Sequence, residues 1–376
     1  MVKNQEYPAI TKKHLAIIAP LDWGLGHTTR CIPLIRELQQ NNFDVVIACN
    51  SNQKLVLQPE FPGVAFVHLS GYGLSYSSSR WKTILKLIFQ LPNILISIKR
   101  ENLQFKRILR QFAPNIIISD NRYGVYSSSI RSVFITHQLK ILTGAGGLAD
   151  RISAYSTHKM IRRFTECWIP DFEGSYFEGS YNLAGILSHP VNKPVFPVRY
   201  IGPLSRFERC NTDVEHDYVL IILSGPEPQR SILESMLLKQ LSAIPGKAIF
   251  VRGVPDEKNI PVSGSNISII NFADSRVLNQ LICEARVVIC RCGYTSVMDL
   301  FKLRKKAVLI PTPGQAEQEY LGRYLSDRKF AVVATQDKLN ISESLELINT
   351  ITLPVPRSME LYKEVINQLQ EEMETV

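Results

Sequence analysis

The sequence lacks a run of about 18 apolar residues, the length that a membrane-spanning helix needs. The nearest candidate, residues 81–98, is interrupted by Lys, Gln, Pro and Asn. Residues 1–13 are polar and have no apolar core typical of a signal peptide. Seven cysteines in 376 residues, with no export signal, are typical of a reducing cytosol. We therefore expect a cytoplasmic protein without a membrane span.

Several patterns that mark functional sites are also missing. Cys290 and Cys292 have no second cysteine pair nearby, which favours buried apolar residues over a metal site. There is no Asp-x-Asp motif, so we expect no metal requirement and no cofactor. Aromatic residues are not interleaved with the basic ones, which disfavours nucleic acid as a partner. Gly24-x-Gly26 has no third glycine at the dinucleotide spacing, which disfavours a dehydrogenase.

Negative charge is scarce in the first half of the chain. Residues 1–205 contain 23 Lys and Arg against 12 Asp and Glu, whereas residues 206–376 contain 20 against 22. The whole excess of the net charge of +9 therefore lies in the first half. This asymmetry indicates that the first half meets an anionic partner, with solubility as the alternative reason.

Short apolar runs alternate with helical patterns along the chain, which predicts an α/β protein with doubly wound parallel sheets. The first set of expected strands is Leu15–Pro20, Asp44–Asn50, Val64–Leu69, Asn115–Asp120, Ser132–Gln138 and Glu166–Pro170. The second set is Tyr218–Ser224, Lys247–Gly253, Asn266–Phe272, Val287–Arg291, Ala307–Pro311 and Phe330–Thr335. Most are continuous apolar runs, as expected where both faces of a sheet are covered.

Helical patterns lie between these strands. In the first half we expect helices at Thr28–Gln40, Thr83–Phe112 (broken at Pro92) and Arg151–Phe164. In the second half we expect them at Gln229–Leu241, Ser275–Cys283, Tyr294–Leu303, Glu317–Asp327, Ser342–Ile351 and Ser358–Met373. Residues 171–197, rich in Gly, Ser, Tyr and Pro, read as a loop region. We expect two Rossmann-like domains, 1–205 and 206–356, facing a cleft, and a C-terminal helix in 357–376 that returns to the first domain.

The first strand is followed by Gly24-Leu-Gly26-His27, where the chain passes from strand to helix. In an open parallel sheet this point borders the ligand crevice. The two glycines permit tight turns and close approach of a ligand. His27 is the one side chain in this stretch with a pKa near neutrality.

Three stretches of the second half also follow strands. Ser224 and Gly225 precede a helix near Gln229, and its exposed N–H groups favour an anion, although an ordinary turn explains the pattern equally well. Arg291-Cys-Gly293-Tyr-Thr295 opens a helix on which Asp299 shares a face with Thr295, so that its carboxylate suits a ribose diol or is merely solvated. Glu317-Gln318 lies in a first helical turn and suits sugar hydroxyls, or caps the helix.

The order and spacing of these stretches resemble the GT-B glycosyltransferases, and most closely glycosyltransferase family 28 and its relatives. The resemblance implies that Ser224 and Gly225 meet the donor diphosphate, that Arg291–Asp299 holds the ribose with Asp in place of Glu, and that Glu317-Gln318 contacts the donor sugar. It also places Gly24, Gly26 and His27 on the acceptor side. The turn after Leu223 departs from the family pattern, because it has Pro226 and Pro228 in place of a double Gly, which removes N–H donors.

The resemblance further implies a mechanism. In related inverting enzymes the histidine after the first strand pairs with an Asp about a hundred residues later, and Asp120, at the end of a buried strand, has that spacing. His27 would then act as the base on an acceptor hydroxyl, with Asp120 orienting it. The departing diphosphate would meet the helix start at Gln229 and Arg252 or Arg291. His137, which also ends a strand, is the alternative for either role or an acceptor-binding residue.

The acceptor is expected on the basic first domain, where Tyr72 lies in a Gly/Ser/Tyr loop, Gly71–Arg80. The following segment, Trp81–Leu91 and Lys99 to Arg110, combines apolar and basic residues and suits an anionic membrane surface. A helix packed on the sheet with a solvated basic face is the alternative. The sequence thus predicts an inverting, metal-independent transfer of a sugar from a nucleotide donor to an acceptor hydroxyl. Uridine diphosphate is the expected nucleotide, and the acceptor is lipid-linked or otherwise unidentified. The alternatives are a nucleotide-sugar 2-epimerase and a non-catalytic nucleotide-sugar-binding subunit.

Overall fold

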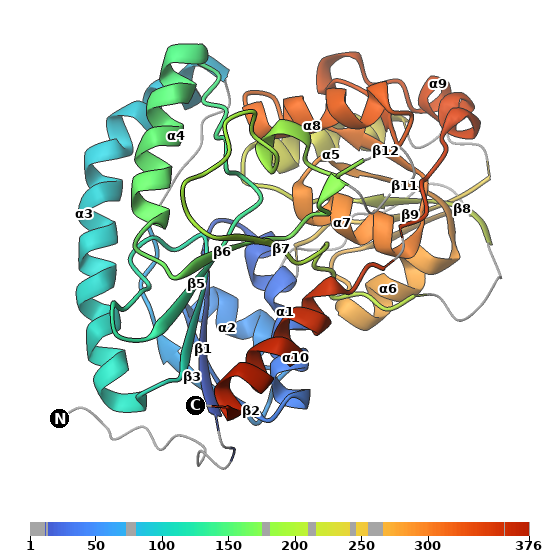
Figure 1. The fold of residues 1–376 in the computed structure, drawn as a ribbon. Helices are drawn as coiled ribbons and strands as arrows, with labels where there is room; N and C mark the ends of the chain where they lie inside the picture. Colours follow the sequence, from blue (N-terminus) through green and yellow to red (C-terminus); the bar gives the residue numbers. More distant parts are fainter. Residues whose placement is uncertain are drawn as a thin grey trace.

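The structure is a computed structural model that describes residues 12, 14–72, 80–174, 181–209, 216–240, 246–254, 266–356 and 358–375, without the side chains of residues 80–92. It contains two parallel sheets, each covered by helices (Figure 1). The first set of elements is β1 His14–Pro20, α1 Leu25–Gln40, β2 Phe43–Cys49, α2 Ser51–Leu57, β3 Ala65–His68, α3 Arg80–Phe112, β4 Ile116–Asp120, β5 Arg131–Ile135, α4 Gly147–Ile161, β6 Glu166–Ile169, the 3-10 helix η2 Gly185–Leu187 and β7 Val198–Tyr200.

The second set begins after the chain has crossed to the other sheet. It comprises β8 His216–Ile222, α5 Gln229–Gln240, β9 Lys247–Val251, β10 Ile267–Ile270, α6 Ser275–Glu284, β11 Ala285–Arg291, α7 Tyr294–Leu303, β12 Ala307–Ile310, α8 Ala316–Asp327, β13 Val332–Val333, η4 Gln336–Lys338, α9 Ile341–Glu346, η5 Leu347–Thr350 and α10 Leu361–Glu374. The predicted boundary near residue 205 falls between β7 and β8.

Both sheets have the doubly wound order. The first runs β3-β2-β1-β4-β5-β6-β7 and the second β10-β9-β8-β11-β12-β13, with every strand pair parallel. The central strands are continuous apolar runs: β1 is buried along its whole length, and so is β4. This confirms the predicted fold class, since strands covered on both faces exclude water from both sides.

The order of successive strands across the sheet reverses between β1 and β4 in the first sheet and between β8 and β11 in the second, although all these strands run parallel. Ligands of doubly wound sheets bind at these points, outside the carboxyl ends of the strands. In the first sheet, Pro20 at the end of β1 is paired with Asp120 at the end of β4. The fold therefore places the α1 start and Asp120 together at one such point.

The two domains are in contact along a shared apolar core. One cluster of buried residues includes Ile35 of α1, Met298 of α7 and Ile366 of α10. The last helix, α10, lies beside α1 of the first domain (Figure 1). Its Glu372 forms an ion pair with Arg131 of β5. The C-terminal segment thus ties the second half of the chain to the first.

Several expectations about single elements were wrong. α3 continues through Pro92 without a break, because the helix is anchored further along by buried residues such as Phe105 and Phe112. The region predicted to be a loop, residues 171–197, contains the short helix η2. The edge strand β7, which directly follows this region, was not predicted, because its residues are only half-buried and leave little apolar signal.

The other differences concern the ends of elements. The strand expected at Ser132–Gln138 ends at Ile135, so His137 lies in the following loop. The strand expected at Phe330–Thr335 is reduced to β13. α1 starts at Leu25, earlier than predicted, so that His27 lies in its first turn. α4 begins and ends earlier than expected, α9 passes into η5, and α10 starts at Leu361.

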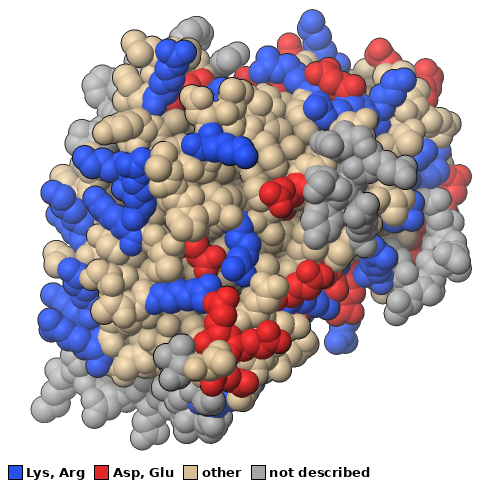
Figure 2. All heavy atoms as spheres, viewed as in Figure 1, with Lys and Arg blue, Asp and Glu red and all other residues tan. Residues whose placement is uncertain are grey.

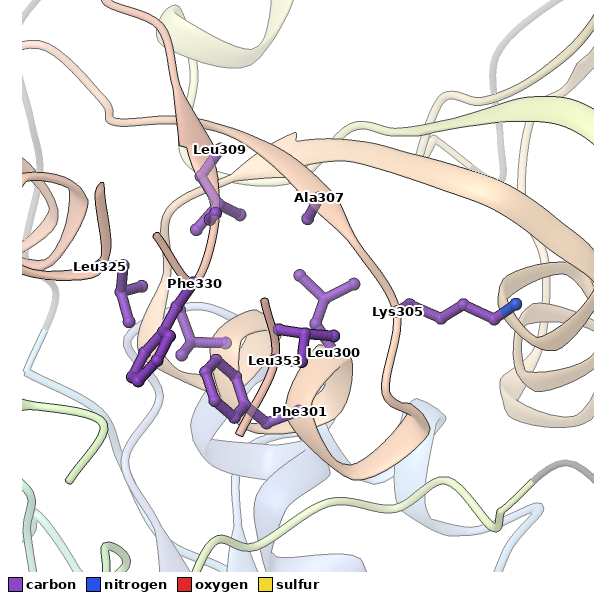
Figure 3. A pocket seen from close by; sticks show the side chains of 10 residues that line it. Leu300, Phe301, Lys305, Ala307, Leu309, Leu325, Phe330 and Leu353 are labelled. Atoms are coloured by element: carbon purple, nitrogen blue, oxygen red, sulfur yellow. The ribbon is translucent and has the colours of Figure 1, made fainter. Parts of the chain in front are cut away.

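No helix in the described part of the chain is long and apolar enough to span a membrane. A small apolar pocket lies behind α7, between Leu300, Phe301, Leu325 and Phe330 (Figure 3). The ammonium group of Lys305 points away from it and donates to the carbonyl of Ala285 at 2.9 Å. With no polar side chain turned inward, this pocket is a packing defect of the core, separate from the chemistry described next.

Candidate active site

The structure brings His27 and Asp120 into direct contact. The imidazole Nδ1 lies 3.3 Å from Oδ1 and 3.2 Å from Oδ2 of the carboxylate. Asp120 is fully buried at the end of β4, whereas the side chain of His27 retains 16% of its exposure. Because Nδ1 faces a carboxylate, it carries the proton, and Nε2 of the neutral ring is left as a proton acceptor. We call this pair the His27–Asp120 dyad.

Arg30 shares the same carboxylate. Arg30 lies one helical turn after His27. The Nε of Arg30 donates to Oδ2 of Asp120 at 2.7 Å, and a second guanidinium nitrogen donates to Oδ1. The thiol of Cys31 also points to Oδ2, at 3.7 Å. The Arg30 side chain is 2% exposed, so a buried cation and a buried anion neutralise each other beside the imidazole.

These contacts set the protonation states of the dyad. Burial alone would raise the pKa of Asp120, but Arg30 and then His27 overcome it and hold that pKa well below its usual range. Burial, and next the positive charge of Arg30, lower the pKa of His27 below 6.5, against the opposing effect of Asp120. The dyad therefore carries an ionised carboxylate and a neutral imidazole at neutral pH.

The two glycines before the dyad have different roles. Gly24 precedes α1 with a φ of 74°, a conformation that favours glycine. Gly26 faces the second domain: a Cβ there would lie 2.8 Å from Oγ1 of Thr295 at the start of α7. The absence of a side chain at Gly26 thus lets the two domains approach each other at the dyad. The close approach of a ligand that was expected at this glycine stays a prediction.

His137 reaches across to the second domain. Its Nε2 lies 2.8 Å from Oε1 of Glu317 in the first turn of α8, and its ring stacks on Tyr294 of α7 with the centroids 4.1 Å apart. Gln138 also donates to Glu317. Burial raises the pKa of Glu317, but His137 and then His27 and Arg30 outweigh it, so that the pKa is lowered. The residue expected to hold the donor sugar thus contacts the first domain in this structure.

Arg291 ends β11 at the switch point of the second sheet. Its guanidinium donates to the carbonyl of Gln229 at 2.7 Å and lies 3.5 Å from that of Pro311. Its Nε has no partner, and within the described ranges no carboxylate forms an ion pair with it. Burial lowers the pKa of Arg291 to about 10. Ser224 and Gly225, which follow the neighbouring strand β8, are exposed.

Arg252 and the start of α5 fit the predicted diphosphate site less directly. Arg252 is buried and forms an ion pair with Glu234 (Nε to Oε1, 2.5 Å), and it donates to Asn271 at 3.0 Å. In the first turn of α5, the N–H of Ser231 lies 3.3 Å from the carboxylate of Glu227. The side-chain amide of the buried Gln229 accepts from Gln336 at 3.3 Å.

The ribose candidates on α7 face the first domain. Asp299 accepts a hydrogen bond of 2.5 Å from Ser205, in the segment that joins the two domains. Burial raises the pKa of Asp299 to about 6, against the opposing effect of Arg206. Thr295 lies against Gly26, and Gly293 precedes the helix with open space where a Cβ would lie.

Two further candidates have their polar groups engaged locally. Gln318 accepts from the N–H of Thr312 at 2.9 Å and so closes the turn before α8. Tyr72 donates to Glu101 at 2.7 Å and accepts from the N–H of Tyr123 at 3.0 Å. The remainder of the predicted acceptor loop, residues 73–79, and the side chains of residues 80–92 lie outside the described residues.

Comparisons with known proteins agree with this architecture. Residues 239–375 match the glycosyltransferase family 28 C-terminal domain. The chain is also similar to proteins named UDP-N-acetylglucosamine--N-acetylmuramyl-(pentapeptide) pyrophosphoryl-undecaprenol N-acetylglucosamine transferase. The protein from Histophilus somni (strain 129Pt) is 22% identical over 345 residues, which cover 87% of this chain and 86% of that protein. The protein from Haemophilus influenzae (strain PittGG) is 23% identical over 370 residues, covering 91% and 95%.

Among solved structures, the spinosyn rhamnosyltransferase SpnG aligns with a TM-score of 0.60 at 14% identity, over 96% of both chains. At that identity the likeness concerns the fold. The chain has two doubly wound domains that contact each other near their switch points. Together with these matches, this architecture defines a glycosyltransferase of the GT-B class. Within that class, residues 239–375 match the C-terminal domain of glycosyltransferase family 28, and the chain as a whole is similar to the N-acetylglucosamine transferases named above. The predicted family resemblance and enzyme class are confirmed.

Sequence reasoning missed Arg30 and Gln138. Arg30 lies three residues after His27, beyond the stretch Gly24–His27 from which the site was predicted. A helix starting at Leu25 places residues 27 and 30 on adjacent positions of one face, and this spacing was the available signal. Gln138 gave no such signal, because its role depends on how the two domains meet.

Proposed function

We propose that this protein is an inverting glycosyltransferase that moves a sugar from a nucleotide donor to an acceptor hydroxyl without a metal ion. The observation that carries the proposal is the His27–Asp120 dyad, whose Nδ1–carboxylate contact leaves Nε2 as the acceptor of a proton. A general base next to an orienting carboxylate is the arrangement that hydroxyl activation needs.

The reaction follows from this geometry. Nε2 of His27 takes the proton of the acceptor hydroxyl while its oxygen bonds to the anomeric carbon of the donor. The bond from that carbon to the diphosphate oxygen breaks, and the electron pair leaves with the diphosphate. Asp120 stabilises the imidazolium that forms. Because attack occurs opposite the leaving group in a single displacement, the anomeric configuration is inverted.

The leaving diphosphate requires positive charge in the second domain. Arg291 supplies a buried guanidinium without a carboxylate partner in the described part of the chain, next to the exposed Ser224 and Gly225. A desolvated cation interacts with an anion more strongly than an exposed one. Arg252 is a weaker candidate, because Glu234 already neutralises it. We therefore assign the diphosphate to Arg291 and propose that protein cations replace a metal ion.

The sugar of the donor would lie between the two domains, near Glu317. In the structure Glu317 is 32% exposed and bonded to His137 and Gln138. A sugar hydroxyl can take the place of either donor, since a carboxylate accepts several hydrogen bonds. The similar proteins are named for a UDP-N-acetylglucosamine donor, so UDP-linked sugars are the first candidates.

A screen of nucleotide sugars tests the proposal. Thermal shift would measure binding, and diphosphate release would measure turnover, for UDP- and dTDP-linked sugars with and without EDTA. We expect binding of a UDP sugar, slow hydrolysis in the absence of an acceptor, and no loss of activity with EDTA. The His27→Gln variant should keep the affinity for the donor and lose turnover. Isomerisation of the sugar without an acceptor would instead identify an epimerase, and binding without turnover a non-catalytic subunit.

We also propose that the acceptor is met at an anionic membrane surface, since the similar proteins are named for an undecaprenol-linked substrate. α3 carries exposed basic residues, namely Lys99, Arg100, Lys106, Arg107 and Arg110. Basic side chains gather over this side of the first domain (Figure 2). On α4, Leu148, Ile152 and Tyr155 share one face and are 74%, 60% and 72% exposed. Apolar side chains beside basic ones suit a headgroup interface.

Vesicle flotation would test this surface. Wild-type protein should float with vesicles that contain anionic lipid and not with neutral ones, and salt should weaken the binding. Ile152→Glu should reduce flotation, whereas Leu55→Glu, at another exposed leucine (74%), should not. Equal flotation of both variants, or none for the wild type, would contradict the proposal.

A further inference from the structure

A carboxylate that orients an imidazole has to be oriented itself. In the dyad, Nδ1 of His27 lies almost equally far from the two oxygens of Asp120, at 3.3 and 3.2 Å. This contact alone leaves the plane of the carboxylate undefined. The two nitrogens of Arg30 each meet a different oxygen, so that a planar fork faces a planar carboxylate.

We propose that Arg30 is a positioning residue of the His27–Asp120 dyad, and that its fork holds the plane of the Asp120 carboxylate toward Nδ1 of His27. This inference rests on the proposed role of His27 as the base. Arg30 itself touches neither substrate nor reacting atoms. It acts through Asp120, from one helical turn further along α1.

The charges around His27 support this role. The groups that face it or its partner are Arg30 and Cys31 on α1, Asp120 of β4, His137 after β5 and Glu317 on α8. After burial, the charge of Arg30 is the largest influence that lowers the pKa of His27, whereas Asp120 raises it. Arg30 therefore keeps the imidazole neutral and able to accept a proton.

The third nitrogen of Arg30 contacts His137, which links the His27–Asp120 dyad to Glu317 of the second domain. It lies 3.5 Å from Nδ1 of His137, whose Nε2 lies 2.8 Å from Glu317. A guanidinium has no acceptor, so this contact favours the form of His137 in which Nδ1 accepts and Nε2–H donates to Glu317. One buried cation thus contacts the dyad and the histidine that bridges the two domains.

The test compares Arg30→Gln with Arg30→Lys, and uses Arg122→Lys as the matched control. Arg122 is also buried and forms an ion pair, with Glu101 at 2.6 Å, but does not contact the dyad. NMR titration of labelled histidines would give the apparent pKa of His27, and kcat and KM for the donor would be measured against pH. In Arg30→Gln the apparent pKa should rise, and the acid limb of kcat/KM should move to higher pH by the same amount.

Arg30→Lys keeps the charge and loses the fork, so kcat should fall tenfold or more while the KM for the donor stays unchanged. This variant decides the matter if Arg30→Gln does not fold. Arg122→Lys should lower thermal stability without moving either titration. The proposal is overturned if His27 titrates in Arg30→Gln as in the wild type, or if Arg30→Lys has wild-type kcat. If no nucleotide sugar is turned over, the proposed function fails, whereas the NMR titration still tests Arg30.

Discussion

At the scale of single residues, the chemistry depends on which nitrogen of His27 carries a proton. The buried carboxylate of Asp120 fixes the proton on Nδ1 and leaves Nε2 as the basic nitrogen of the ring. Removing the carboxylate would leave both the imidazole and Arg30 without their common partner. A substitution of Asp120 therefore lowers both the catalytic rate and the stability of the fold. A control variant is needed to separate these two effects.

Asp120→Asn should lower kcat by about 10²- to 10⁴-fold, because the neutral amide neither fixes the tautomer nor stabilises the imidazolium. It also leaves the buried Arg30 unpaired, which should cost about 3–5 kcal/mol of stability. Glu101→Gln leaves the buried Arg122 unpaired outside the dyad. Steady-state kinetics and thermal unfolding of both variants should show similar losses of stability and a far larger loss of kcat in Asp120→Asn.

The pH dependence of the reaction follows from the lowered pKa of His27. Burial and Arg30 place it below the ordinary value of 6.5, and catalysis needs the neutral ring. Activity should therefore be level around neutral pH and fall only as the pH drops below 6.5 through the pKa of the folded protein. A profile of kcat/KM against pH measures this, and an acid limb centred above 6.5 would contradict it.

The pairing of His27 with Asp120 was predictable from the resemblance to inverting glycosyltransferases, together with the place of Asp120 at a strand end. The contacts of Arg291 with two carbonyls, of Asp299 with Ser205 and of Glu317 with His137 were not. A strand end can be read from apolar runs, whereas the partner of a long polar side chain depends on how separate elements pack.

At the scale of elements, the start of α1 positions the base against α7. The strand–helix junctions could be predicted because buried parallel strands are continuous apolar runs. The ends of helices and the edge strand β7 could not, because half-buried residues carry a weak pattern. Gly26 illustrates the difference: its place after β1 was evident, but its contact with Thr295 of the other domain was not.

Gly26→Ala should destabilise the protein by about 1–3 kcal/mol, because the new Cβ would lie 2.8 Å from Oγ1 of Thr295. The backbone of Gly26 has no positive φ, so a steric contact is the reason for the loss. In the double variant with Thr295→Ala the clashing oxygen is gone, and part of the stability should return. Thermal unfolding of the two single variants and the double variant would measure this coupling, and strictly additive effects would contradict the contact.

At the scale of the whole molecule, the two domains meet through side chains from both sheets' carboxyl ends and through α10. The hydroxyl oxygen of Tyr320 on α8 accepts a hydrogen bond of 3.0 Å from the N–H of Ile186, and Tyr324 donates to the carbonyl of Asn182 at 3.0 Å. Gly185 lies between these two tyrosines with a φ of 55°. The sequence predicted two domains, but not this interface, since neither tyrosine shows a partner before the domains are placed.

Gly185→Ala should destabilise the protein by about 2–4 kcal/mol, since a Cβ there would meet the ring of Tyr324 at 2.6 Å in a backbone conformation unfavourable to alanine. Gly63→Ala is the control, because Gly63 has open space and no positive φ, and should change stability by about 0.5 kcal/mol or less. Denaturant unfolding of both variants gives the comparison. Equal stabilities would show that the turn at Gly185 does not hold the domains together.

The central claim is that His27 is the base of a sugar transfer, and single-turnover kinetics test it most directly. With the nucleotide sugar that binds the wild type, the rate of diphosphate release would be compared between the wild type and His27→Gln, and the Kd for the donor measured for both. We predict an unchanged Kd and a rate lower by about 10²- to 10⁴-fold in the variant. A variant that releases diphosphate at the wild-type rate would contradict the account.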